Sequence, residues 1–212
     1  MTRLLSLLLL VALPAVADHK LEKGVAAPDG IPVVLRNLVQ AQGVRVLNDA
    51  GAPYAEIWLH KALNAEAKAP GAEVLYGGIP EGSFLRVWRF VAPGSDFRGQ
   101  SIKPGFYSMR YALMPSDGNH IGAAQYRDFV LLVAAAADEK PDANLKFDEV
   151  VALSRKASST GHPAVFPMLS PESATEPTLA KNDRGHWILK AKVLTKTGGD
   201  LPVAITVVGR AE

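Results

Sequence analysis

Short apolar or alternating segments, separated by turn residues, recur along most of this chain of 212 residues. Segments rich in β-branched and aromatic residues and bounded by Gly, Pro, Asn or Asp are typical of β-strands. They lie at 31–39, 43–47, 54–60, 84–91, 106–114, 128–134, 186–196 and 201–209, and 162–170 adds a shorter one. Because most of them follow one another without an intervening helical pattern, a parallel βαβ sheet is disfavoured. The pattern predicts an antiparallel β-sandwich, and a closed β-barrel is the alternative that strand periodicity leaves open.

The segment at 186–196 shows the clearest alternation. One face would carry an apolar row and the other a polar row: Trp187, Leu189, Ala191 and Val193 against His186, Lys190 and Lys192. Such alternation predicts a strand with one solvated face. The pair Gly198-Gly199 then favours a hairpin turn at 197–200, because glycine tolerates positive φ.

Each of the three tryptophans, Trp58, Trp88 and Trp187, lies in a predicted strand with apolar neighbours. Core packing is the expected role, and an exposed aromatic platform for carbohydrate is the alternative. Because Trp187 heads the apolar face of its strand, Trp187→Ala is expected to cost about 3–5 kcal/mol of stability.

One short helix is predicted near the C-terminal third of the sequence, with Asp148 and Glu149 at its start and Arg155 and Lys156 at its end. Phe147, Val150 and Val151 fall on one stripe together with Ser154. Acidic residues at the start of this segment and basic residues at its end suit the helix macrodipole.

Composition narrows the function classes. The chain has 23 basic and 21 acidic residues and a formal net charge of +2, without long blocks of one sign. Such a balance gives no electrostatic footprint for nucleic acid or an anionic membrane surface. The absence of cysteine excludes disulfides, thiolate metal sites and Cys nucleophiles. A hydrophobic core must therefore hold the fold together, and 48% hydrophobic residues make this feasible.

The first seventeen residues have the pattern of a secretory signal peptide. Arg3 precedes a short apolar stretch at 4–13, and Ala15-Val16-Ala17 fits a small-residue cleavage site. We expect cleavage after Ala17, leaving one β-sandwich domain at 18–212 in the periplasm or outside the cell, without membrane insertion. An uncleaved membrane anchor is the alternative.

The loop at 115–121 is the predicted position of a ligand site. It joins the strands at 106–114 and 128–134, which are expected to be antiparallel neighbours, and it is longer than such a pair needs. Arg110, Asp117 and His120 would form the rim of the site. In the alternative interpretation, three arginines only balance charge at the sheet edge: Arg98, Arg110 and Arg127 would pair with Asp96 and Asp128.

A metal site is a weaker hypothesis. It would need His60, His120 and His162 to converge with Asp128 from separate loops, whereas no sequence spacing requires this. Independent surface or packed histidines are the alternative. The sequence lacks the local motifs of common hydrolases, kinases and dehydrogenases, and no cofactor is expected.

Several short motifs in the middle of the chain resemble a family of uncharacterised secreted bacterial β-rich proteins, a domain of unknown function. They are Tyr-Gly-Gly-Ile-Pro-Glu-Gly at 76–82, Asp-Phe-Arg-Gly-Gln at 96–100, Lys-Pro-Gly-Phe-Tyr at 103–107, Arg-Tyr at 110–111 and Arg-Asp-Phe at 127–129. The resemblance implies a β-rich envelope protein of unassigned role and supplies no catalytic residue.

The sequence therefore favours a non-catalytic binding or structural module of the cell envelope. Its partner would be a small molecule, a glycan or an envelope protein. The alternative is a metal-dependent or acid–base enzyme that uses His120 and neighbouring loop residues.

Overall fold

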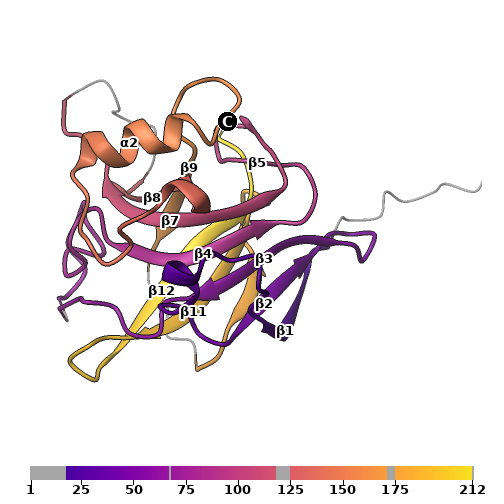
Figure 1. Cartoon of the computed structure of the whole chain (residues 1–212), viewed down its shortest axis with the longest axis horizontal. Coiled ribbons are helices and arrows are strands. Elements are labelled where there is room, and N and C mark those ends of the chain that lie inside the picture. Colours follow the sequence, from indigo (N-terminus) through magenta and orange to yellow (C-terminus); the bar gives the residue numbers. More distant parts are fainter. Residues whose placement is uncertain (1–17, 67, 118–124, 171–174, 212) are drawn as a thin grey trace, which may run out of the picture.

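The computed structural model describes residues 18–66, 68–117, 125–170 and 175–211, and Figure 1 shows their arrangement. Within these residues, ten strands pair into one continuous antiparallel sheet. In sheet order they are β1 (Lys20–Ala26), β2 (Gln42–Leu47), β3 (Pro53–Leu59), β4 (Phe84–Phe90), β7 (Gly105–Leu113), β8 (Asp128–Ala134), β9 (Val165–Leu169), β12 (Asp200–Val208), β11 (Trp187–Leu194) and β10 (Thr178–Lys181). The other described elements are the ribbon of β5 (Gly94–Ser95) and β6 (Ser101–Ile102) and the short helices α1 (Val33–Arg36), η1 (Ala135–Ala137) and α2 (Phe147–Arg155). The predicted leader at 1–17 lies outside the described residues.

The sheet is strongly curved, so that its first and last strands approach each other. Lys23 on β1 forms a salt bridge of 2.9 Å with Glu176, just before β10. We call the place where these two ends of the sheet meet the seam. There the ring centroids of His19, just before β1, and Trp187 on β11 are 5.5 Å apart. The predicted mainly β, antiparallel class is confirmed. One sheet that folds over on itself combines features of the sandwich and of the barrel.

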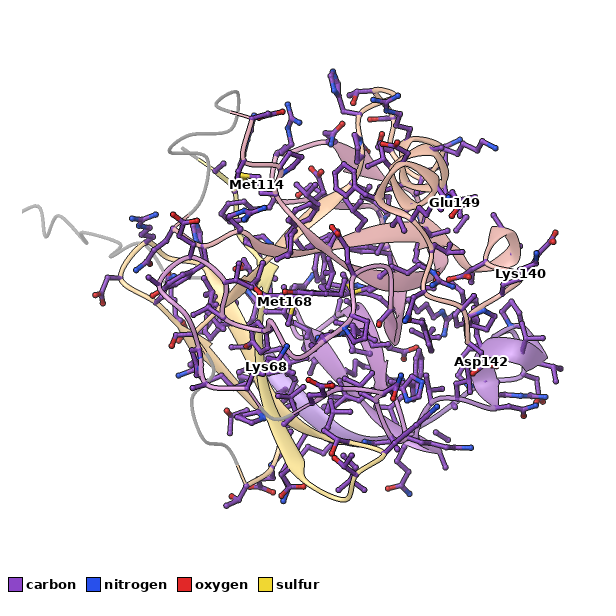
Figure 2. All side chains as sticks on the ribbon, turned by 90° about the vertical axis from the view of Figure 1, so that its left-hand side faces the viewer. Lys68, Met114, Lys140, Asp142, Glu149 and Met168 are labelled. Atoms are coloured by element: carbon purple, nitrogen blue, oxygen red, sulfur yellow. The ribbon has the colours of Figure 1, made fainter. Side chains whose placement is uncertain are left out.

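The inner, concave face of the sheet holds the largest hydrophobic core. Rings from neighbouring strands pack there: Trp88 lies 5.4 Å from Phe90 and 5.0 Å from Phe166, centroid to centroid. Figure 2 shows Met168 of β9 in the middle of the molecule, whereas Lys140 and Glu149 lie at its periphery. The inner core therefore runs across nearly the whole sheet, from β2 to β11.

One end of the inner core is closed by the residues between β3 and β4, 61–66 and 68–83, which we call the crossing segment. Its backbone bonds to the ends of distant strands: Leu63 N–H donates to Leu194 O at 2.7 Å, and Gly82 N–H to Tyr111 O at 2.8 Å. The crossing segment also contributes buried side chains to the inner core: Leu63, Ala65, Leu75, Tyr76 and Ile79. It thereby covers the end of the sheet at which β3, β7 and β11 finish.

The prediction of a strand at 31–39 is wrong, because this segment contains helix α1. Ile31, Leu35 and Val39 are buried together against Trp58 and other residues of the outer face of the sheet. Their spacing of four residues is that of a helical stripe, and Pro32 immediately precedes the helix. The β-branched residues Val33 and Val34, which suggested a strand, are largely exposed.

Helix α2 confirms the predicted C-terminal helix. Val150 is fully buried and packs on the outer face of β8 against Phe129, Leu131 and Val133. The Glu149 carboxylate accepts the backbone N–H of Lys146 at 2.9 Å, which caps the start of the helix. No helix in the described part of the chain is long and apolar enough to cross a bilayer.

Most predicted strands are present, with ends that differ by a few residues. β7 and β8 are antiparallel neighbours, as expected, with Leu113 opposite Asp128. The two edge strands β1 and β10 were not predicted. β1 reads Lys-Leu-Glu-Lys-Gly-Val-Ala and β10 reads Thr-Leu-Ala-Lys, so charged and small residues interrupt the strand pattern.

The core prediction holds for Trp58 and Trp88, both fully buried, whereas Trp187 is only partly buried. Trp187 lies at the seam, between the His19 ring and the Lys181 ammonium group, which is 5.7 Å from the Trp187 ring centroid.

Because folding removes less of the Trp187 surface from water than that of a fully buried tryptophan, we expect Trp187→Ala to cost about 2 kcal/mol. Urea unfolding measures this, and Trp88→Ala is the matched variant with the larger expected loss. An equal loss for both would contradict the difference in burial.

Candidate functional site

Arg110, one of the predicted ligand-binding residues, is fully buried on the outer face of β7. Its guanidinium forms a bidentate pair with the Asp138 carboxylate, at 2.9 Å from Nε and 2.6 Å from Nη2. The remaining N–H groups donate to the carbonyls of Gly82, Lys140 and Ala143. Ser108 also donates to Asp138. Every donor of Arg110 is thus used within the fold, and the group holds the residues after η1 against β7.

The other two predicted ligand residues are placed differently. Asp117 is exposed, and His120 lies outside the described residues, which stop at 117 and resume at 125. The structure therefore does not bring Asp117 and Arg110 into a common buried site.

Asp128 is buried at the start of β8 and serves as an acceptor for three groups. Its carboxylate accepts the backbone N–H groups of Leu75 at 2.7 Å and Tyr76 at 2.9 Å. It also accepts the hydroxyl of Tyr111. Burial, reinforced by this carboxylate, raises the pKa of Tyr111, so the phenol stays protonated. Asp128 thereby anchors the crossing segment to the sheet.

The expected pairing of three arginines with Asp96 and Asp128 is wrong. Arg110 pairs with Asp138, and Arg127 Nε donates to the carbonyl of Met114 at 2.7 Å. Asp96 is buried and accepts N–H groups instead, from the backbone and side chain of Gln100 and from the backbone of Arg98 and Val165. Backbone donors in turns, which a sequence does not display, replace the expected guanidinium partners.

The proposed metal ligands are not gathered in the described part of the chain, where no three His, Asp or Glu side chains form a group that could hold a metal ion. His60 Nδ1 accepts the backbone N–H of Ala62 at 3.0 Å, and its ring lies 5.6 Å from that of Phe84. His162 is exposed.

The environment of His60 predicts a pH effect on stability. Burial lowers the pKa of His60 from 6.5 to about 4, so the folded state disfavours the proton that the unfolded chain accepts. His60 therefore contributes stability above pH 6.5 that is lost as the pH falls toward 4. The decrease in the free energy of unfolding between pH 7 and pH 4 should be about 1–2 kcal/mol smaller in His60→Gln than in the wild type. Partial exposure of the ring to solvent keeps this difference modest.

Urea unfolding of both proteins between pH 7 and pH 4 measures the effect. The exposed His162 offers the control, since His162→Gln should keep the wild-type pH dependence. The same pH dependence in the wild type and in His60→Gln would contradict the assignment.

A pocket in the described part of the chain lies on the outer face of β9, β12, β11 and β10. It has a volume of about 480 Å³, and we call it the outer groove. Ten residues line it: Gln125, Tyr126, Leu169, Ser170, Ala180, Lys181, Asn182, Ile188, Lys190 and Ala204. A smaller hollow of about 220 Å³ adjoins it and shares Gln125, Leu169 and Asn182.

The chemistry of the outer groove is mixed. Leu169, Ile188 and Ala204 are apolar, whereas Lys190, two amides and two hydroxyl groups supply polar contacts. Asn182 is held by its turn, where its side-chain oxygen accepts the backbone N–H groups of Arg184 and His186. A groove of this kind suits a small ligand that combines an apolar face with hydroxyl or carboxylate groups.

Sequence reasoning did not identify the outer groove, because it depends on strands that are distant in the chain. β9 and β12 are neighbours although thirty residues or so separate them, and β10 was not predicted. The available signal was the polar row of the β11 segment, of which Lys190 lines the groove.

Comparison with protein-family models, with curated proteins and with solved structures gave no match. The resemblance to a secreted bacterial family accordingly stays a prediction.

Proposed function

We propose that the chain is an exported, non-catalytic binding protein of the cell envelope that takes a sugar or sugar acid in the outer groove. The observation that carries this proposal is the groove itself, with an apolar floor and convergent lysine, amide and hydroxyl groups. Sugars present apolar ring faces beside many hydroxyl groups, and a carboxylate on a sugar acid complements Lys190, which lines the groove on the outer face of β11.

Saturation-transfer NMR with a panel of neutral monosaccharides, disaccharides and uronic acids tests the proposal. We expect saturable binding that Lys190→Gln weakens about tenfold for uronic acids, since a charge-assisted contact is lost. Ala180→Trp should abolish binding of every sugar, because the indole would fill the groove.

Lys192→Gln is the matched control. Lys192 is on the same strand as Lys190 but pairs with Asp200 at 2.7 Å and does not line the groove. Binding should be unchanged in this variant. Absence of binding to the whole panel would contradict the sugar proposal and favour the structural role that the sequence also allows.

Export is a separate part of the proposal, supported by the leader-like pattern of residues 1–17. We expect protein recovered from the periplasm or medium of a bacterial host to begin at Asp18. Intact-mass measurement tests this. A retained leader would contradict the cleavage prediction, and protein confined to the cytoplasm would contradict export.

A further inference from the structure

Arg86 is a charged residue inside the inner core. On β4 it shares a face with Trp88 and Phe90, both inner-core residues, because alternate residues of a strand point the same way. Its cross-strand partners are Leu59 on β3 and Met109 on β7, which also belong to the inner core. The residue is only 1% exposed.

Two of the three guanidinium nitrogens of Arg86 lack a hydrogen-bond partner among the described residues. Its Nε and Nη1 atoms are buried and form no hydrogen bond, and Nε1 of Trp88 on the same face is also buried without a partner. Arg110, equally buried on the opposite face of the sheet, uses every donor and faces a carboxylate. Full burial of arginine in this fold is thus compensated in one case and uncompensated in the other.

Tyr76 interacts electrostatically with Arg86, but the hydrogen bonds of its hydroxyl group are already made to other partners. The Tyr76 hydroxyl donates to Leu169 O at 2.8 Å and accepts Ala204 N–H at 2.9 Å. The Asp128 carboxylate accepts three other donors. Burial lowers the pKa of Arg86 to about 10, so the guanidinium is still charged at neutral pH.

An uncompensated charge in an apolar interior is strongly unfavourable. Arg86 and Trp88 offer only N–H donors, so the missing partner is an acceptor, and it must carry negative charge to neutralise the guanidinium. Water would satisfy the N–H groups without balancing the charge. The surrounding side chains are themselves tightly buried core residues, which favours a small ion over an organic acid.

We infer that the inner core of this protein binds a small monovalent anion, of the size and charge of chloride, against Nε and Nη1 of Arg86. The site is on the inner face of the sheet, whereas the outer groove is on the opposite face. An experiment that contradicts one proposal therefore leaves the other unaffected. The anion is a structural ligand, bound to the folded state and released on unfolding.

Urea unfolding at constant ionic strength, with sodium gluconate replaced stepwise by sodium chloride, tests the inference. For the wild type, the unfolding equilibrium constant should decrease as chloride is added, by a factor of one plus the ratio of the chloride concentration to its Kd. The decrease is about 100-fold when the chloride concentration exceeds its Kd 100-fold. Arg86→Met should abolish the chloride dependence. In gluconate alone this variant should be at least as stable as the wild type, because a buried charge has been removed.

Arg89→Gln is the matched control on the same strand. Arg89 faces outward, where it pairs with Glu56 at 3.1 Å. This variant should keep the full chloride dependence. Equal chloride responses in the wild type and in Arg86→Met, or loss of the response in Arg89→Gln, would overturn the inference.

Chloride-35 NMR provides a readout that needs no variant. Rapid exchange of chloride with the folded wild type should broaden the line, and bromide or unfolding in urea should remove the broadening. A line width that is the same for folded and unfolded protein would overturn the inference even if Arg86→Met did not fold.

Discussion

Asp138→Ala should destabilise the protein by about 3–5 kcal/mol, because it leaves the guanidinium of Arg110 buried without its counter-charge. Both side chains are almost completely inaccessible, at 0% and 1%, and two hydrogen bonds join them. Ser108 would lose its acceptor in the same variant. The free energy of unfolding in urea measures the loss.

Two further variants show whether burial of the ion pair causes the large loss of stability expected for Asp138→Ala. Asp200→Ala breaks the exposed pair with Lys192 and should cost less than about 1 kcal/mol, because solvent screens it. The double variant Arg110→Met with Asp138→Leu should recover much of the loss from Asp138→Ala, since no unpaired charge remains. Similar losses for Asp138→Ala and Asp200→Ala would contradict a structural role for the buried pair.

The fold was predictable where one periodicity dominated a segment. The strand at 128–134 has the predicted bounds, and α2 (Phe147–Arg155) forms where the apolar stripe indicated a helix. The segment at 31–39 satisfied two patterns at once, since β-branched residues suggested a strand while Ile31, Leu35 and Val39 follow a helical spacing. Packing against the sheet decided between them, and a single sequence does not contain that information.

The roles of individual charged residues were much less predictable. Arg86 and Arg110 both occur within apolar strand segments, yet they point to opposite faces of the sheet. A β-bulge between Phe84 and Arg86 places Phe84 on the outer face, although strict alternation would put it on the inner face with Arg86. The partner of Arg110 is 28 residues away, beyond strand β8 and helix η1, so only the folded chain identifies it.

Asp128→Ala should be the second strongly destabilising change, with an expected loss of about 3–5 kcal/mol. The substitution would leave two backbone N–H groups, of Leu75 and Tyr76, and the Tyr111 hydroxyl buried without an acceptor. It would also release the crossing segment from β8, so the end of the inner core would open. Urea unfolding gives the size of the loss, and hydrogen exchange at Leu75 and Tyr76 gives its location.

Glu81→Ala is the matched control for this prediction. Glu81 also accepts a backbone N–H with its carboxylate, from Leu113 at 2.9 Å, but it is exposed, so water replaces the lost acceptor. Its loss should be below about 1 kcal/mol. The same pair of variants separates the structural role of Asp128 from the metal hypothesis, because a metal ligand would make wild-type stability depend on added zinc. A zinc-dependent rise in stability that Asp128→Ala abolishes and Glu81→Ala retains would show that the carboxylate binds metal rather than anchoring the crossing segment.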